Sequence, residues 1–375
     1  MNPVSSPAGR GHQLTPLQRR LHLDGPLLLL IALLTALGLV VLYSAADNSL
    51  AAVQQQAIRL SVAAAGLIIV AQIPPQLMRV LAPWGFGLAI ITLVAVPFIG
   101  IEGGGARRWI ALGPINIQPS ELMKIALPVA LSAYLAGRHL PPRLPDLIAS
   151  LVLIALPVAL IAIQPDLGTA ILAAATGFFV VFLAGLQWRY IIGATVAAIP
   201  AIAAFWHYIM QDYQRERVLT FLNPEREPLG AGYHIIQAKI AIGSGGVYGK
   251  GWLNGTQAHL DFLPERQTDF VFAVLAEELG FVGVCALIGI YLAVVARGLW
   301  IASQAQDDFG RLLAGAVSLT FFVYCFVNIG MVSGLLPVVG LPLPLISFGG
   351  TSVVTLMAGF GILMAVHTHR RTWSG

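Results

Sequence analysis

The sequence has 375 residues, of which 57% are hydrophobic and 10% are charged, and its mean hydropathy is +0.82. Soluble domains carry about 25% charged residues, so this composition excludes an ordinary soluble protein and predicts an integral membrane protein. The net charge of +4 and the pI near 9.2 do not indicate a nucleic-acid partner, because basic residues facing an anionic inner leaflet account for them.

Ten apolar segments are long enough to cross a bilayer as helices, which takes roughly 20 residues each. The predicted spans are 24–46, 52–72, 77–99, 119–137, 146–163, 168–186, 189–207, 270–300, 312–335 and 343–366. The predicted fold class is an all-α polytopic membrane protein with about ten transmembrane helices. A large polar loop, 208–268, separates the seventh span from the eighth.

The distribution of arginine in short loops orients the chain, since such residues are retained on the cytoplasmic side. It predicts a cytoplasmic N-terminal tail (1–23), a single transmembrane domain (24–369) and a cytoplasmic C-terminal tail (370–375). No small-residue cleavage site follows the first apolar run, so we expect a retained anchor. The loops 98–118 and 208–268 then face the outside.

The first outward loop, GIEGGGARRWIALGPINIQPS, contains Arg108 and Trp109 among glycines and is a candidate site. The helix that follows begins QPSELMKIA, where Glu121 complements the positive helix end and Lys124 lies one turn deeper. Asp166 lies in the tight outward turn QPDLGTA, directly before the next span. A helix cap and a supporting role at the site both remain open for it.

The loop 208–268 contains no spanning run, but a short amphipathic piece near 234–242 predicts surface-lying or re-entrant helices. Such helices exist at membrane depth only beside protein or a water-filled cavity. The loop closes with FLPERQTDF, which places Asp269 at the mouth of a span. An acid there faces a low-dielectric wall that strengthens its interactions, although a plain helix-start carboxylate is the alternative.

Further polar groups lie within the last spans. At about 100° per residue, Glu277 lies roughly 80° from Asp269, so substrate contact and structural pairing are both open for it. The segment SGLLPVVGLPLPLISFGGTS has four prolines and paired glycines that distort a helix, and it includes the hydroxyl of Ser347. Cys285 and Cys325 lie in apolar spans and indicate neither a disulfide nor a zinc site.

One outward acid among many cations suggests a phosphate-bearing substrate, because arginine and lysine are the usual partners of phosphate oxygens. The cations are Arg107, Arg108, Lys124, Arg215, Arg217, Lys239 and Arg266. A carboxylate can take the proton of an attacking hydroxyl, and cations can stabilise a departing pyrophosphate. No nucleotide-binding loop, HExxH or GxSxG motif occurs.

The motifs GGARRW, QPSELMKIA, QPDLGTA, FLPERQTDFVFAVLAEELG and PVVGLPLPLISFGGTS together resemble the SEDS family of cell-wall polymerases, over residues 23–369. Within it the chain is more similar to the elongation branch than to the division branch. The resemblance implies a fold similar to GT-C glycosyltransferases, a bacterial inner-membrane location and a periplasmic active site. It also implies a peptidoglycan glycosyltransferase that polymerises lipid II by inverting transfer, with Asp269 as the general base.

The resemblance also implies substrate-binding residues and partners. The candidates are Arg108, Trp109, Glu121, Lys124, Asp166, Lys239, Asp261, Glu277 and Ser347, with Arg108, Lys124 and Lys239 assigned to pyrophosphate or cavity electrostatics. The implied partners are a class B penicillin-binding protein and an elongation complex of MreC, MreD and MreB. No metal ligands are identified, but Mg²⁺ or Mn²⁺ stays open because carboxylates plus phosphate can hold an ion without a motif.

Two other functions remain open. A cavity with intramembrane charges also suits a lipid II flippase, although a transporter requires charges near the midplane and access from both sides. A non-catalytic scaffold for the penicillin-binding protein is the third, and would make Asp269 a helix cap that asparagine can replace.

Overall fold

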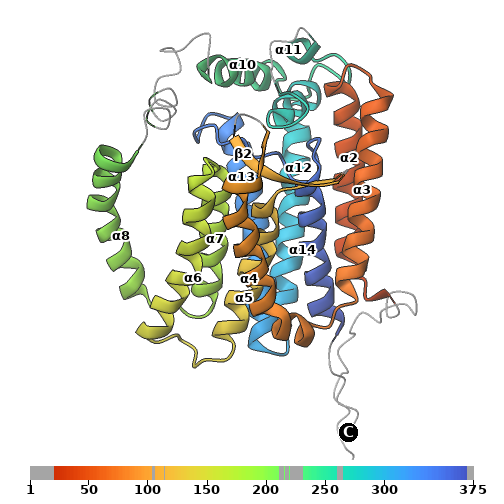
Figure 1. Ribbon diagram of the computed structural model, residues 1–375. Helices are drawn as coiled ribbons and strands as arrows, with labels where there is room; N and C mark the ends of the chain where they lie inside the picture. Colours follow the sequence, from red (N-terminus) through yellow and green to blue (C-terminus); the bar gives the residue numbers. More distant parts are fainter. Residues whose placement is uncertain are drawn as a thin grey trace, which may run out of the picture.

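The computed structural model describes residues 21–103, 106–113, 115–210, 215, 219, 231–259 and 265–369. The described chain forms an upright bundle of helices, with α10 and α11 lying across one end (Figure 1). The long helices are α2 (Gly25–Ala45), α3 (Leu50–Ala71), α4 (Pro75–Ile99), α5 (Pro119–Leu135), α6 (Leu144–Ile163), α7 (Leu167–Leu183), α8 (Trp188–Ala204), α12 (Val271–Ser303), α13 (Asp308–Val332) and α14 (Thr351–Thr368). The shorter ones are the π-helix η1 (Phe205–Ile209), α10 (Ala231–Ser244) and α11 (Thr256–His259).

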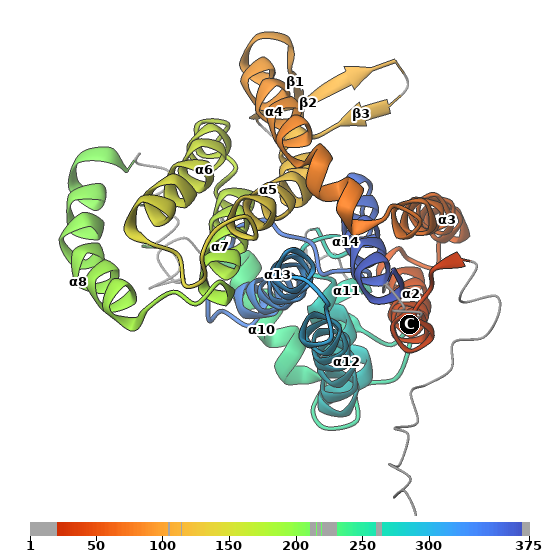
Figure 2. The same cartoon turned by 90° about the horizontal axis from the view of Figure 1, so that it is seen from below.

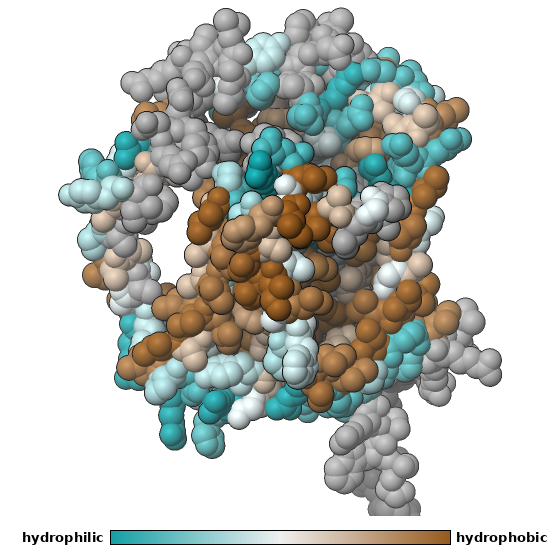
Figure 3. Space-filling view, viewed as in Figure 1, coloured by the Kyte–Doolittle hydropathy of each residue, from teal (hydrophilic) through white to brown (hydrophobic). Residues whose placement is uncertain are grey.

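Within the described residues, the ten long helices lie at the ten predicted spans. Seven of them are long and apolar enough to cross a membrane by length and composition, while α5, α7 and α8 have 17 residues each and are shorter. The face seen in Figure 3 has a hydrophobic band across its middle, with hydrophilic residues above and below it. The structure is mostly helical, and the predicted polytopic helical membrane fold is confirmed.

The loop 98–118, which was predicted to face outward, forms a small antiparallel sheet instead of an irregular connection. Its strands, β1 (Ile101–Gly103), β2 (Ala106–Leu112) and β3 (Ile115–Ile117), pair in the order β1-β2-β3. The sheet lies at the edge of the bundle beside α4 (Figure 2). It leads directly into α5 and thereby fixes where that helix begins.

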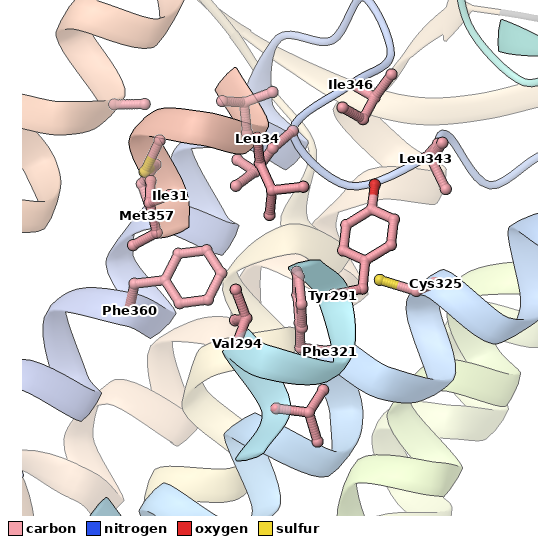
Figure 4. Packing of buried hydrophobic residues seen from close by; sticks show 14 of the residues in the cluster. Ile31, Leu34, Tyr291, Val294, Phe321, Cys325, Leu343, Ile346, Met357 and Phe360 are labelled. Atoms are coloured by element: carbon pink, nitrogen blue, oxygen red, sulfur yellow. The ribbon is translucent and has the colours of Figure 1, made fainter. Parts of the chain in front are cut away.

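The largest buried cluster joins α2, α3, α12, α13 and α14. At its centre the rings of Tyr291, Phe321 and Phe360 meet edge to face, with centroids 5.7 and 5.2 Å apart (Figure 4), an arrangement that aromatic quadrupoles favour. The Tyr291 hydroxyl donates to the Pro344 carbonyl at 2.7 Å. The core therefore anchors the proline-rich segment between α13 and α14.

α12 is broken one-third of the way along, at Gly280, whose φ of 64° is outside the helical range. The glycine-rich loop after α10 fills the break: Lys250 and Gly251 donate to the carbonyls of Glu277 and Glu278, both at 3.0 Å. A Cβ on Gly280 would clash with the backbone of Gly249. The bonds to the loop satisfy backbone groups that the break removes from the helix, as membrane depth demands.

Both described chain ends lie at the end of the bundle opposite α10 and α11 (Figure 1). His22 bonds to Thr368 at 3.1 Å and stacks on His369 with ring centroids 3.9 Å apart. Termini on one side agree with the predicted topology, whereas the side of the membrane they face stays a prediction.

Candidate active site

Asp269 lies in a turn, 265–270, that precedes α12 at the end of the bundle covered by α10. Its carboxylate is partly buried and has no hydrogen bond or ion pair with the residues that the structure describes. The N-cap residue of α12 is Phe270, and no described side chain caps the helix. The alternative interpretation of Asp269 as a helix cap is therefore not what the structure shows.

The surroundings of Asp269 change its acidity. Burial raises the pKa of this carboxyl group to about 6, and the negative charge of Glu265 contributes in the same direction. A base works best when its pKa lies near the operating pH. At neutral pH Asp269 is still mostly ionised, so it can accept a proton.

The backbone that carries Asp269 is held by three donors. The carbonyls of residues 267–269 accept, in order, from the Phe348 amide at 2.8 Å, from the Ser347 hydroxyl, and from Nδ2 of Asn328 at 3.0 Å. Gln56 of α3 braces the same region, because its amide bonds to the Ser347 carbonyl and the Gly349 N–H, both at 3.3 Å. Three elements distant in sequence thus fix one turn.

A buried ion pair lies on α5. Lys124 Nζ is 2.7 Å from Glu121 Oε1, with both side chains 9% exposed, and it also lies 5.1 Å from the Tyr324 ring centroid. Both residues line a cavity of about 60 Å³ together with Thr176, Thr320, Tyr324, Ser352 and Thr355. Tyr324 is close enough to Asp269 for a Coulombic interaction, so the ion pair and the acid belong to one region.

Arg108 is fixed beside this region by backbone carbonyls. Its guanidinium donates to the carbonyls of Gln164 at 3.2 Å and Pro165 at 2.7 Å. The next residue, Asp166, caps α7 by accepting from the Thr169 N–H at 3.2 Å, and it has a Coulombic interaction with Lys124. The structure therefore shows the helix-cap role of Asp166, and it brings Arg108, Asp166 and Lys124 together.

The remaining predicted site residues differ in their exposure and in the contacts that they make within the protein. Trp109 follows Arg108 on β2 and pairs with Ile101 of β1. Lys239 is exposed on α10, with its side chain against Gly334 of the α13–α14 connection. Arg266 pairs with Asp47. Asp261, with Arg217, lies outside the described residues.

Glu277 is occupied by contacts within the protein. Its side chain is fully buried and accepts from Lys250 at 2.6 Å, Thr256 at 2.9 Å and the Gln257 N–H at 3.1 Å. The neighbouring Glu278 accepts from the Ser44 hydroxyl of α2. These contacts correspond to the structural pairing that the sequence left open, and contact of Glu277 with substrate stays a prediction. The same is true of Ser347, whose buried hydroxyl is used within the protein.

Sequence reasoning gave no role to Gln56 and Tyr324, and it left helix packing and ligand contact both open for Asn328. All three are buried polar side chains within apolar helices, a costly placement that indicates packing or function. That signal was available, but the partners, up to 293 positions away in the sequence, were not.

The described residues contain no group of three or more histidine, cysteine, aspartate or glutamate side chains placed to hold a metal ion. Asp269 and Glu265 are two carboxylates near each other. A divalent ion held by one or two carboxylates and substrate phosphates therefore stays a prediction.

An apolar groove of about 360 Å³ runs between α3, α4 and α5. Its walls include Val70, Met78, Gly85 and Leu122, and it shares Ile125 with the cavity beside Lys124. The groove therefore borders the region of the ion pair.

The fold and this site define a multi-span helical membrane protein in which an acid without a partner among the described side chains lies beside cations at one end of the bundle. Residues 26–372 match the sequence profile of the FtsW/RodA/SpoVE family, described as cell cycle proteins, and the chain belongs to this family. The resemblance to the SEDS family is confirmed.

Named relatives agree with this assignment. The chain is 50% identical over 355 residues to the peptidoglycan glycosyltransferase MrdB of Escherichia coli K12, covering 95% of this chain and 96% of that protein. It is 37% identical to a probable peptidoglycan glycosyltransferase FtsW of Trichlorobacter lovleyi, over 92% of each chain.

Two solved structures are similar. A chain from a peptidoglycan synthase complex, solved to explain how polymerization and crosslinking are coordinated, aligns with a TM-score of 0.82 at 35% identity, over 93% of this chain and 98% of that one. The rod shape-determining protein RodA of Thermus thermophilus aligns with a TM-score of 0.71 at 31% identity, with the same coverage.

Proposed function

We propose that this protein is a peptidoglycan glycosyltransferase that polymerises lipid II into glycan strands during cell elongation, with Asp269 as its general base. The observation that carries the proposal is the Asp269 carboxylate, which has no partner among the described side chains, whereas Lys124 and Arg266 are paired with Glu121 and Asp47. The relatives at 50% and 37% identity bear the name of this activity.

The reaction moves one proton and one glycosyl group. Asp269 accepts the proton of the GlcNAc 4-hydroxyl of one substrate as that oxygen attacks the anomeric carbon of the MurNAc of the other. The bond from this carbon to the diphosphate breaks, and its electron pair leaves with undecaprenyl pyrophosphate. Attack opposite the leaving group converts the α-linked donor to a β-1,4 linkage, and Asp269 then returns its proton to water.

The departing diphosphate requires positive charge as the bond breaks. Lys124 and Arg108 supply it at the site, and the exposed Lys239 supplies it at the rim. These cations are held in place by their neighbours Trp109, Glu121 and Asp166. Asp261 belongs to the same predicted site. The apolar groove beside Ile125 accommodates part of an isoprenoid tail.

The proposed activity also implies where the protein lies in the membrane and which proteins it works with. The periplasmic side of the inner membrane is the Asp269 end, with both termini cytoplasmic. The partner is a class B penicillin-binding protein, consistent with the similar chain from a synthase complex, and MreC, MreD and MreB complete the elongation assembly.

Purified full-length protein with its penicillin-binding partner and lipid II should form glycan strands, whereas Asp269→Asn should form them at least about 100-fold more slowly while the complex stays intact. Polymer at the wild-type rate in the variant would refute the base assignment. Movement of lipid II across vesicles without polymer would favour the flippase instead. Titration of the reaction with a chelator tests the divalent ion.

A further inference from the structure

We propose that Asn328 is a positioning residue for Asp269, fixing both the peptide of this base and the segment that faces its carboxylate. The inference rests on the proposed function and deepens it. Asn328 lies near the end of α13, and its side chain is fully buried and bonds backbone carbonyls.

A single carboxamide makes both contacts. Nδ2 of Asn328 donates to the Asp269 carbonyl at 3.0 Å and to the Leu341 carbonyl at 2.6 Å. Leu341 follows Gly340, and a Cβ on Gly340 would lie 3.4 Å from Oδ2 of Asp269. Asn328 therefore sets the distance between the acid's own backbone and the chain segment next to its carboxylate.

The conformation at Gly340 depends on this arrangement. Its φ is 72°, in the left-handed region that favours glycine. The prolines around it prevent the segment from joining α14 as helix, so side-chain bonds have to hold it. Asn328 provides one of these bonds, and Ser347 provides another through the Leu343 N–H at 2.7 Å.

The two polar ends of the Asn328 side chain are used unequally. Oδ1 of Asn328 is buried and has no hydrogen-bond partner in the described structure, and an unsatisfied buried acceptor lowers stability. An apolar side chain would avoid this cost, but it would leave the carbonyls of Asp269 and Leu341 without this donor. Local conflicts of this kind occur where function needs a particular group, which here is a donor pair aimed at the turn of the base.

The test uses Asn328→Leu, which keeps the size and removes both donors, and Asn328→Asp, which keeps the shape and replaces the donor nitrogen with oxygen. Ser318→Ala is the matched control, because this hydroxyl lies on the same helix, is buried and bonds the Ala314 carbonyl of its own helix. Each full-length variant is measured for kcat and KM on lipid II, and for hydrogen–deuterium exchange of the peptide covering 265–272.

A displacement of about 1 Å at a catalytic group can cost about 100-fold in rate. We expect kcat per folded molecule to fall at least about tenfold in both Asn328 variants, with KM within about twofold of the wild type, and exchange in 265–272 to rise. Ser318→Ala should leave all three unchanged. A purely structural role would instead lower the folded fraction and leave kcat per folded molecule intact.

Wild-type kcat in either folded Asn328 variant, a rise in KM equal to the loss of kcat/KM, or unchanged exchange in 265–272 would overturn the inference. If the wild type made no polymer while Asn328→Leu still loosened 265–272, the proposed function would fail and the positioning contact would stand. The exchange readout separates these outcomes because it needs no activity.

Discussion

Asp24 and Asp269 occupy similar places in the sequence, each just ahead of a long apolar helix, but their surroundings are opposite. Asp24 is fully buried, caps α2 through the Leu27 N–H at 2.9 Å, and receives Arg297 at 2.6 and 3.1 Å and His367 at 3.3 Å. Asp269 is partly buried and its carboxylate has no such partner among the described residues.

The two residues show how an acid with a structural role differs from an acid that is available for catalysis. A buried carboxylate normally obtains partners that repay its desolvation, as Asp24 does at the end of the bundle where the termini lie. At the opposite end the described partners of residues 267–269 are directed at backbone carbonyls, and none of them engages the Asp269 side chain. The position is rigid and the reactive group is available, as a base requires.

The largest expected effect is the loss of polymerisation in Asp269→Asn, by about 100-fold or more, since this is the typical contribution of a general base. Its thermal unfolding temperature should equal or slightly exceed the wild type, because the change removes a charge that burial disfavours. Initial rates and thermal unfolding curves, measured on one preparation, test the predicted loss of activity and the predicted stability. A variant that loses activity and stability together would place Asp269 with Asp24 among the structural acids.

The next effect concerns the ion pair on α5. Lys124→Met leaves Glu121 buried without its partner and should lower the free energy of unfolding by about 3 kcal/mol, with at least about tenfold lower polymerisation from the missing cation. Glu121→Gln combined with Lys124→Met should regain most of the stability because no charge is left unpaired. Activity should stay low in the double variant. Recovery of activity in the double variant would mean that the ion pair has only a structural role.

Asp24→Asn should show the reverse pattern of Asp269→Asn. Asparagine retains an acceptor for the Leu27 N–H but no longer neutralises Arg297, whose side chain is 21% exposed, so we expect a loss of about 3 kcal/mol, at the lower end for a broken buried pair. Polymerisation per folded molecule should stay within about twofold of the wild type. A larger loss at full stability would mean that the two ends of the bundle are coupled.

Much of the fold could be predicted because hydropathy alone defines membrane spans. The boundaries were less accurate where local rules compete. The last span was predicted from residue 343, but α14 begins at Thr351, since Pro342 and Pro344 keep the preceding chain out of a helix. The sheet at 101–117 was not predicted, although its strands pair within one local segment. The break at Gly280 was not predicted because it depends on packing against the distant loop around Gly249.

The candidate site was predicted in part. Asp269 was identified from its position, and its catalytic role stays a prediction. The predicted angle of roughly 80° between Glu277 and Asp269 requires both residues to lie in one helix, but α12 begins at Val271 after a turn. The bonds of Asn328 and Ser347 to residues 267–269 join positions 59 and 79 apart, and no periodicity in the sequence reveals them.

The smallest expected effect tests the acidity of Asp269 itself. Because the base has to be deprotonated and its pKa is about 6, polymerisation should fall as the pH drops through about 6, by about tenfold per unit below it. The charge of Glu265 raises this pKa, so Glu265→Gln should lower it and move the acid limb to lower pH. The amide oxygen introduced by this substitution can still accept the Thr268 hydroxyl bond, which is 2.8 Å long in the wild type.

Rates of the Glu265→Gln variant should therefore exceed the wild type by up to about threefold near pH ~5.5 and match it at about pH 8, because removing a neighbouring like charge lowers an acid's pKa. Asp308→Asn is the control, since it removes an exposed charge paired with Arg311 at the end of the bundle opposite Asp269, and its acid limb should not move. An acid limb unaffected by Glu265→Gln would mean that a group other than Asp269 governs the pH dependence. The contrast between Asp269 and the fully paired Asp24 would then rest on the activity of Asp269→Asn.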